Sequence, residues 1–202
     1  NQKKEKIRKK LGFKSNEIII GSFQKDGHGW DEGNQPKLIK GPDLFVQTVE
    51  ILSKDLPIKV LLTGPARGYV KKELTKRQIQ FVHFHVNSYK EIANFYNALD
   101  LYIVSSREEG GPKAIVESMA SGVPLVSTNV GMASDFIIDN KNGGLINSFN
   151  PEELAAKSLK ILMSPYKEEL INEAREDVLR ADWKNVANLY LEKIYKKSIM
   201  NN

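Results

Sequence analysis

The sequence contains no cysteine. Disulfide bonds, thiolate nucleophiles and zinc sites built on thiolates are therefore excluded. Histidine is also scarce, because only His28, His83 and His85 are present, and this argues against a metal site made of histidine side chains. A chain without cysteine suits a reducing compartment, so we expect a cytoplasmic protein.

Long apolar runs are missing as well. No run approaches the ~20 apolar residues that a bilayer-spanning helix needs, and no signal-peptide pattern opens the sequence. We therefore expect neither a membrane span nor a leader. Apolar residues make up 41% and charged residues 27% of the 202 residues, which is ordinary for a single globular domain.

A basic surface spread over the whole fold is not expected either, although the net charge is +5. Residues 1–14 alone carry a net charge of +6, which leaves −1 for the remainder. This distribution argues against nucleic acid as a partner. It favours a solvated basic helix or linker over a patch for anionic lipid, and it leaves open a peripheral association with the inner face of a membrane.

Short apolar, β-branched runs alternate with longer segments of helical period. This alternation predicts an α/β fold with a doubly wound parallel sheet. The strand runs are almost continuously apolar, as expected when helices cover both faces of a sheet. We expect strands at 17–23, 58–63, 79–85, 100–105, 124–128 and 144–146. We expect helices at 3–11, 42–52, 70–78, 89–98, 112–120, 133–139, 151–163, 166–180 and 183–199.

Three helix boundaries have recognisable chemistry. Asn150 followed by Pro151 reads as an N-cap and the first helical residue. Asp182 is expected to cap the last helix, and Gly12 is expected to end the first.

The strongest functional signal lies in residues 105–124, directly after an expected strand. This segment contains a glycine pair (Gly110, Gly111) and two carboxylates, Glu109 and Glu117. A loop with free N–H groups that leads into a helix N-terminus forms an anion site. Two carboxylates beside such a site suit a ligand with both phosphates and hydroxyls, which is the description of a nucleotide-sugar.

Together with its tail Ser-Met-Ala-Ser-Gly-Val-Pro at 118–124, this segment resembles the donor-site signature of retaining GT-B glycosyltransferases of family 4. The family signature also places two glutamates eight positions apart, as Glu109 and Glu117 are here. Two positions depart from it. Gly111 stands where the family has an aromatic residue, and Pro112 stands where it has a second glycine. Pro112 offers no N–H to a phosphate, but it suits the first turn of a helix.

The resemblance covers nearly the whole sequence. Residues 1–14 and the strand after them look like the family's interdomain linker and the first strand of its C-terminal domain. Residues 183–200 look like the closing helix, which crosses back toward the N-terminal domain. The resemblance implies that residues 1–202 form one nucleotide-sugar-binding domain, which is half of a GT-B fold. It also implies that the N-terminal acceptor domain, which carries the family's catalytic histidine, is absent.

The same resemblance assigns roles to individual residues. Glu109 would be the catalytic residue, in contact with the sugar hydroxyls and the oxocarbenium-like centre. Glu117 would hold the ribose hydroxyls. The other donor-binding residues that it implies are Gly110, Gly111, Lys113 and Ala114 around the phosphates, with Val86 and Asn87 near the base.

Two lysines correspond to basic residues that contact the donor diphosphate in the family. Lys40 with Gly41 matches a Lys-Gly pair, whereas Lys25 stands where the family has arginine and lacks the two-pronged donor geometry of that residue. Fixed cations there would stabilise the diphosphate leaving group, so we expect no metal and no cofactor beside the nucleotide-diphosphate-sugar substrate. The long segment 24–41 between the two lysines is either a lid or an elaborated loop.

We therefore expect the donor-binding domain of a metal-independent, retaining glycosyltransferase. Such an enzyme moves a sugar from a nucleotide-diphosphate-sugar to a glycan, lipid or small-molecule acceptor. Its expected partners are the donor and its own N-terminal domain. Two alternatives stay open, namely a GT-B enzyme like the nucleotide-sugar 2-epimerases and a sugar-nucleotide-binding module without catalysis.

Overall fold

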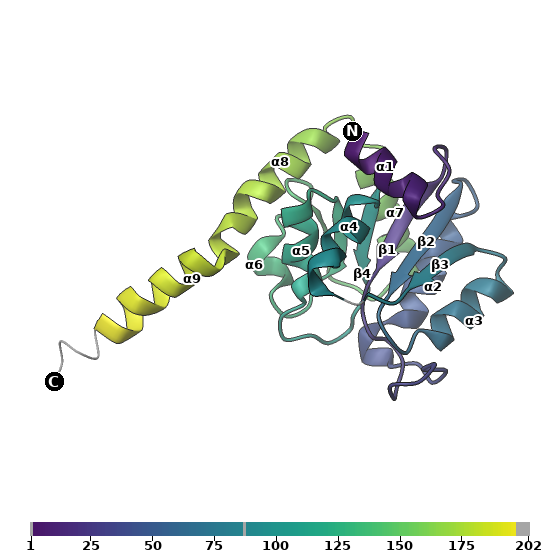
Figure 1. The fold of residues 1–202 in the computed structure, drawn as a ribbon, viewed down its shortest axis with the longest axis horizontal. Coiled ribbons are helices and arrows are strands. Elements are labelled where there is room, and N and C mark those ends of the chain that lie inside the picture. The colour runs from purple at the N-terminus through teal and green to yellow at the C-terminus, as the bar shows by residue number, and fades with distance from the viewer. Residues whose placement is uncertain (1, 87, 197–202) are drawn as a thin grey trace.

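A computed structural model describes residues 2–86 and 88–196, and within them the chain forms a six-stranded parallel sheet (Figure 1). Its strands lie in the order β3-β2-β1-β4-β5-β6. The bounds are β1 (Ile18–Ser22), β2 (Ile58–Thr63), β3 (Gln80–Phe84), β4 (Leu101–Val104), β5 (Leu125–Thr128) and β6 (Gly144–Ile146). The strand order reverses between β1 and β4, as in Rossmann-like folds. The predicted α/β, doubly wound fold is therefore confirmed.

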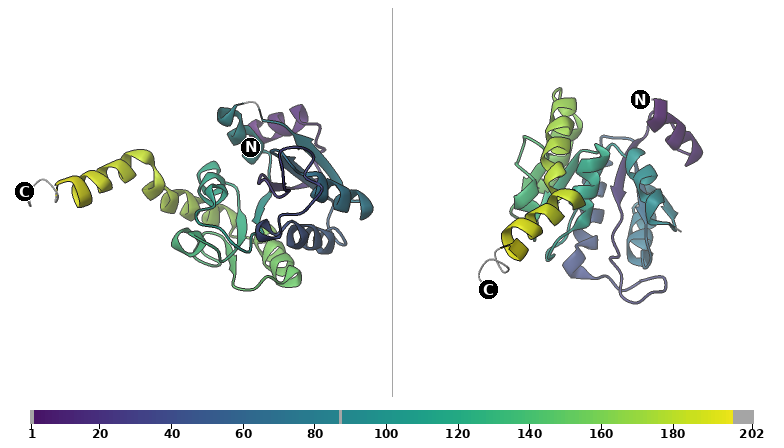
Figure 2. Two further views of the ribbon diagram at one scale, coloured as in Figure 1. Left: turned by 90° about the horizontal axis from the view of Figure 1, so that it is seen from below. Right: turned by 60° about the vertical axis from the view of Figure 1, so that its left-hand side comes forward.

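Helices cover both faces of this sheet (Figures 1 and 2). One face is covered by α2 (Pro42–Leu52), α3 (Gly68–Lys76) and α7 (Pro151–Leu162). The other is covered by α1 (Gln2–Lys10), α4 (Ile92–Asn97), α5 (Lys113–Ser121) and α6 (Ala133–Phe136), with α8 (Lys167–Val178) packed against α5. Short helical turns are η1 (Leu38–Lys40), η2 (Tyr89–Glu91) and η3 (Leu179–Ala181). The chain continues as α9 (Trp183–Tyr190) and a π-helical turn, η4 (Leu191–Tyr195).

Successive strand residues enter two different cores. In β1, Ile20 packs with α2 and α3, whereas its neighbour Ile19 packs with the helices of the other face. In β2, Leu62 and Leu61 divide in the same way. Side chains alternate along a strand, so both alternating sets must be apolar when helices cover both faces. This is why the strands of this sequence read as continuous apolar runs.

The predicted helix boundaries are largely confirmed. The Asn150 side chain accepts a hydrogen bond from the N–H of Glu153 at 2.7 Å, and the Asp182 side chain accepts one from the N–H of Lys184 at 2.8 Å. Gly12, with φ of 78°, follows the end of α1. These local caps make the ends of helices readable from the sequence.

The helix predicted at 133–139 is shorter in the structure. It ends at Phe136 because Ile137 is extended. The Asn142 side chain then accepts the N–H of Ile138 at 2.8 Å and donates to the carbonyl of Phe136 at 2.9 Å. A side chain that satisfies backbone groups in this way competes with further helical turns.

The last helix extends away from the sheet (Figures 1 and 2). Every residue of α9 is at least partly exposed, and Trp183 is 84% exposed. The helix predicted for 183–199 is present as α9 and η4, and its residues beyond 196 lie outside the described part of the chain. Within the residues that the structure describes, no helix combines the length and apolar character needed to span a bilayer.

Candidate functional site

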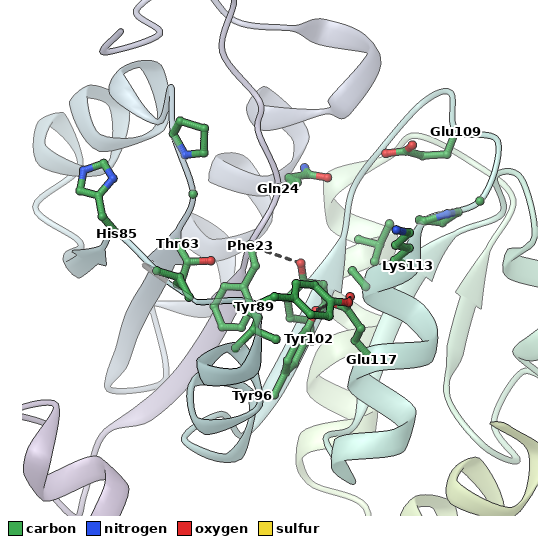
Figure 3. Close-up of a pocket in the computed structure, with 18 residues that line it drawn as sticks. Phe23, Gln24, Thr63, His85, Tyr89, Tyr96, Tyr102, Glu109, Lys113 and Glu117 are labelled. Atoms are coloured by element: carbon green, nitrogen blue, oxygen red, sulfur yellow. Dashed lines mark hydrogen bonds between the residues drawn. The ribbon is translucent and has the colours of Figure 1, made fainter. Parts of the chain in front are cut away.

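A pocket of about 530 Å³ opens at the carboxyl edge of the sheet, where the strand order reverses (Figure 3). Its lining comes from segments that follow β1, β2, β3 and β4, together with residues of η2, α4 and α5. Ligands of open parallel sheets bind in this crevice, and the volume is within the usual range for small-molecule sites. In Figure 3, Lys113 and Glu117 face the pocket from one side and Thr63 and His85 from the other.

The start of α5 forms one wall of this pocket. Gly111, Lys113 and Ala114 line it, whereas Gly110 lies in the loop just outside. Pro112 is the N-cap, with φ −69° and ψ 99°, and so it precedes the helix rather than occupying its first turn as predicted. The first N–H groups of a helix have no partner within it, and the helix dipole adds partial positive charge there. This wall therefore suits an anionic group.

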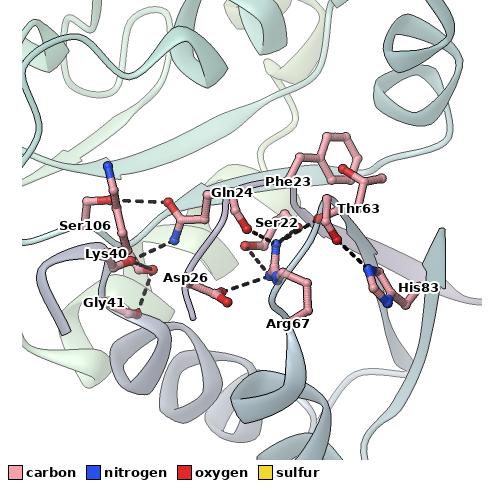
Figure 4. Close-up of polar contacts among 12 residues, drawn as sticks. Ser22, Phe23, Gln24, Asp26, Lys40, Gly41, Thr63, Arg67, His83 and Ser106 are labelled. Carbon is pink, nitrogen blue, oxygen red and sulfur yellow. Dashed lines mark hydrogen bonds and ion pairs between the residues drawn. The ribbon is translucent and has the colours of Figure 1, made fainter. Parts of the chain in front are cut away.

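Glu109 lies between a cation and a hydroxyl at the pocket. The ammonium of Lys40 is 2.6 Å from Glu109 Oε1, and Ser106 Oγ donates to the same oxygen at 2.9 Å. Gln24 supports both partners, because its amide nitrogen donates to the Lys40 carbonyl at 2.7 Å and its amide oxygen lies 3.3 Å from Ser106 Oγ (Figure 4). Glu109 and Gln24 line the pocket, and Lys40 reaches its edge through the ion pair.

Glu117 is held by two tyrosine hydroxyls. Tyr89 donates to Oε1, and Tyr96 donates to Oε2 at 3.0 Å. The bond to Glu117 raises the pKa of Tyr89 to about 12, and burial raises the pKa of Tyr96 well above its usual value. Both phenols thus stay protonated donors at neutral pH. Tyr96 is 1% exposed and Tyr89 is 71% exposed, so one partner is fixed in the core and the other lies at the surface.

An aromatic cluster forms the wall beneath Glu117. The ring centroids of Phe23 and Tyr96 are 4.8 Å apart, and those of Phe23 and Tyr102 are 5.3 Å apart. The N–H of Phe23 donates to Tyr102 Oη at 2.9 Å. Our sequence analysis did not identify these residues. For the two tyrosines that hold Glu117, a signal was available. Tyr89 and Tyr96 are seven positions apart in the helix expected at 89–98, and this spacing places both on one helix face.

Lys25 lies outside the pocket. Its ammonium is 3.5 Å from the centroid of the Trp30 ring, a cation–π contact at the surface of the 24–41 segment. This segment is an elaborated loop held against α3, since the N–H of Tyr69 donates to the Gly33 carbonyl at 3.1 Å. The structure thus brings Lys40, but not Lys25, close to the predicted site.

The third strand leads into the side of the pocket where we expected the base. Val86 and His85 line the pocket, and Asn87 lies outside the described residues. His83 is hydrogen-bonded through Nε2 to the carbonyl of Gly64 at 2.7 Å, and Gly64 also lines the pocket. The roles assigned to the site residues stay predictions.

This arrangement can bind one ligand through two kinds of contact. The α5 N-terminus and Lys40 suit phosphate oxygens, whereas Glu109 and Glu117 suit hydroxyl donors. Among the described residues, no group of three or more acidic or histidine side chains is arranged to hold a metal ion.

Comparison with known proteins yields consistent matches. The family model described as glycosyl transferases group 1 matches residues 35–177. The lipopolysaccharide core biosynthesis mannosyltransferase LpsB of Rhizobium meliloti is 30% identical over 174 residues, which cover 79% of this chain and 43% of LpsB. The chain therefore spans less than half the length of this relative.

Solved structures share the fold over almost all of the chain. A glycosyltransferase from Rickettsia africae superposes with a TM-score of 0.79 and 25% identity, covering 100% of this chain and 53% of that protein. Anabaena HepE, solved in complex with UDP-glucose, superposes with a TM-score of 0.71 and 21% identity, covering 93% of this chain and 52% of HepE.

Proposed function

The chain belongs to the glycosyl transferases group 1 family, and from this membership we propose that it is the nucleotide-sugar-binding domain of a retaining glycosyltransferase. The sugar would pass from a nucleotide-diphosphate-sugar to a glycan, lipid or small-molecule acceptor. Because the chain spans about half of the proteins that it matches, we propose that transfer takes place in a longer protein whose other domain binds the acceptor. That the related HepE was solved with UDP-glucose supports a nucleotide-sugar as the donor.

One observation carries this proposal. Glu109 and Glu117 line one pocket on the two sides of the α5 N-terminus, so that hydroxyl acceptors flank an anion site. A nucleotide-sugar presents hydroxyls on either side of its diphosphate, with the sugar on one side and the ribose on the other. The order of groups in the ligand thus matches the order of groups in the pocket.

The chemistry of transfer follows from this order. Breaking the bond between the anomeric carbon and the phosphate oxygen leaves negative charge on the diphosphate and positive charge on the sugar ring. The α5 N-terminus and Lys40 would stabilise the first, and Glu109 would stabilise the second. Because these charges are fixed before the bond breaks, no reorganisation is required during the reaction. We propose that these groups suffice without a metal ion.

The two alternatives are less well supported. An enzyme like the nucleotide-sugar 2-epimerases would share the fold, but the matched family and LpsB bear transferase names. A binding module without catalysis would use the same pocket, but the matched family is described as glycosyl transferases. A cytoplasmic location, with peripheral contact to the inner face of a membrane in the full-length protein, stays a prediction.

Calorimetric titration with UDP, GDP and ADP, each beside its nucleoside, tests the proposed function. We expect one diphosphate to bind with micromolar to millimolar affinity and its nucleoside to bind far more weakly. Lys40→Ala should weaken diphosphate binding by ~1–3 kcal/mol, the range of a charge-assisted contact. Lys54→Ala is the matched control, because Lys54 is exposed at the opposite edge of the sheet, between α2 and β2. Equal affinity for nucleoside and diphosphate would contradict the proposal.

A further inference from the structure

Arg67 is a buried arginine behind the pocket wall, between β2 and α3 (Figure 4). Its side chain is 0% exposed. One nitrogen, Nη1, donates to three carbonyls, those of Ser22 at 2.8 Å, Gln24 at 2.5 Å and Thr63 at 3.2 Å. The other, Nη2, donates to Ser22 Oγ at 3.1 Å. A single guanidinium thus joins the carboxyl end of β1 to the carboxyl end of β2.

Asp26 supplies the matching negative charge. Its Oδ2 lies 3.1 Å from Arg67 Nη2, and its side chain is also 0% exposed. Among the described residues, neither of its carboxylate oxygens accepts a hydrogen bond, so Arg67 is the partner that compensates this buried charge. Breaking such a pair leaves one uncompensated charge inside the protein. The pair therefore ties the start of the 24–41 loop to the same guanidinium.

The loop is packed closely against the segment that carries Arg67. A Cβ on Gly27 would lie 2.4 Å from the Ala66 carbonyl oxygen, and one on Gly33 would lie 2.5 Å from Ala66 Cα. The N–H of Gly68 donates to the Glu32 carbonyl as well. This contact is backbone against backbone on both sides of Arg67, so the loop and the guanidinium are held in one fixed relation.

The segments that Arg67 joins are the pocket wall itself. Phe23 and Gln24 follow β1, Thr63 ends β2, and all three line the pocket. The amide of Gln24 also positions Lys40 and Ser106, the two groups that hold Glu109. If the β1 end moved, Gln24 would move with it and shift Lys40 and Ser106, which contact Glu109.

We propose that Arg67 is a positioning residue of the donor site, which, with Asp26 as its counter-ion, sets the spacing of the β1 and β2 ends around the bound nucleotide-sugar. The proposal rests on the proposed function, because it concerns the same pocket. Lysine cannot take this role in full. Arg67 contacts the carbonyls of both strand ends through Nη1 and also Ser22 Oγ and Asp26 through Nη2, whereas lysine has one nitrogen for all of these acceptors.

Arg67→Lys tests this role, with Arg67→Met and Asp26→Asn beside it. The matched control is Arg8→Met, which removes a guanidinium that pairs with Asp100 at the opposite end of the sheet, before β4. Two quantities are measured for every variant that unfolds cooperatively. The first is the Kd for whichever of UDP, GDP and ADP binds the wild-type chain best. The second is amide hydrogen exchange at Lys37 and Tyr69, because their N–H groups donate to the Asp26 and Gly33 carbonyls of the loop.

We expect Arg67→Lys to weaken nucleotide binding by about tenfold, the lower end of the effect that outer-shell partners have in metal sites. Exchange at the two reporter amides should become faster, whereas exchange in α7 should stay unchanged. Arg8→Met should lower the melting temperature and leave both the Kd and the reporter amides unchanged. If Arg67→Met does not fold, Arg67→Lys and Asp26→Asn carry the comparison.

Two results would overturn the proposal. One is a wild-type Kd in Arg67→Lys. The other is an equal loss of affinity in Arg8→Met at a similar loss of melting temperature, because that would trace the effect to global stability. A wild-type chain that binds none of the three diphosphates would instead refute the proposed function, and the positioning role would fall with it. The two failures are thus distinguished by the wild-type titration alone.

Discussion

At the scale of single residues, two carboxylates of one motif have different surroundings. Glu109 faces the Lys40 ammonium and the Ser106 hydroxyl, whereas Glu117 faces two phenols on an aromatic wall. The surroundings of Glu109 are charged and polar, which suits the role that we propose for it beside the sugar. Those of Glu117 orient both of its oxygens by neutral donors. We therefore expect the two residues to act on different parts of the ligand.

Substitution should separate these two parts. Glu117→Ala should weaken binding of the free nucleoside diphosphate, since ribose contacts are lost, and by a similar factor that of the sugar-diphosphate. Glu109→Ala should weaken mainly the sugar-diphosphate, because the free diphosphate lacks the sugar. Each loss should be ~1–3 kcal/mol by calorimetry, the range of a hydrogen bond to a charged group. Glu108→Ala, at the exposed neighbouring position, is the control. Identical losses for both variants with both ligands would contradict this division.

Asp26 should make stability depend on pH in an unusual direction. Burial raises the pKa of Asp26 to about 6, although the Arg67 charge opposes this shift. In the unfolded chain an aspartate has a pKa of about 3.9. The folded state therefore binds the Asp26 proton more tightly, and this stabilisation is fully present below about pH 4 and lost as the pH rises through about 6.

Urea unfolding of wild type and Asp26→Asn between pH 4 and pH 7 measures this contribution. The stability of wild type relative to the variant should fall by up to about 3 kcal/mol as the pH rises, because asparagine does not titrate. Asp100→Asn is a control of opposite sign. Burial opposes the shift there, but Lys4 and Arg8 hold the pKa of Asp100 below its usual value. A pH-independent difference for Asp26→Asn would refute the prediction.

At the scale of elements, the 24–41 loop packs against the segment at the start of α3, next to the β1 and β2 ends that line the pocket. This contact requires glycine where the two backbones meet. Gly33 has φ of 68° and its missing Cβ would lie 2.5 Å from Ala66 Cα. The described loop is thus held against the start of α3, and it contributes Gln24 to the pocket lining.

Gly33→Ala should destabilise the chain far more than Gly29→Ala. Both positions have positive φ, 68° at Gly33 and 77° at Gly29, so both variants bear the left-handed strain of ~1–2 kcal/mol. Only Gly33→Ala adds a steric conflict, for which overpacking costs about 1–3 kcal/mol more. At Gly29 a Cβ would meet no described atom within 4 Å. Thermal unfolding measures the difference in stability between the two variants. Equal losses of stability would show that the loop moves away from Ala66 without a measurable energetic penalty.

At the scale of the whole molecule, the chain presents its pocket on an open edge of the sheet. It covers 53% of the Rickettsia africae glycosyltransferase, and its last helix extends away from the sheet (Figure 1). In a two-domain enzyme the acceptor is held against the donor by the opposite domain, and closure excludes water. A donor-binding domain by itself supplies neither the bound acceptor nor the exclusion of water.

The isolated chain should therefore bind donor but transfer no sugar. Positioning supplies a large part of the rate in such reactions, and we propose that another domain of a longer protein holds the acceptor. Incubation of residues 1–202 with radiolabelled nucleotide-sugar and candidate acceptors measures this directly. Binding of the same donor, shown by calorimetry, is the control for a folded site. Transfer above the rate of spontaneous donor hydrolysis would mean that the catalytic site is complete within this chain.

The sequence by itself determined the elements of this protein and the place of its main motif. Apolar periodicity and caps such as Asn150 and Asp182 are local signals, because the residues that form each contact are only a few positions apart. The motif around Glu109 and Glu117 is local in the same sense, since one strand–loop–helix unit carries it. The sequence predicted a doubly wound parallel sheet, but not the order in which its strands lie side by side.

Only the tertiary structure decided how distant residues contact one another at the site. Lys40 and Glu109 are 69 positions apart, and Arg67 reaches back to Ser22 across 45 positions. Such pairs depend on which strands become neighbours, and periodicity does not encode this. Lys25 shows the same limit. The resemblance implied a phosphate contact for Lys25, and that role stays a prediction. The structure places its ammonium 3.5 Å from the centroid of the Trp30 ring, on a loop that packs against the start of α3.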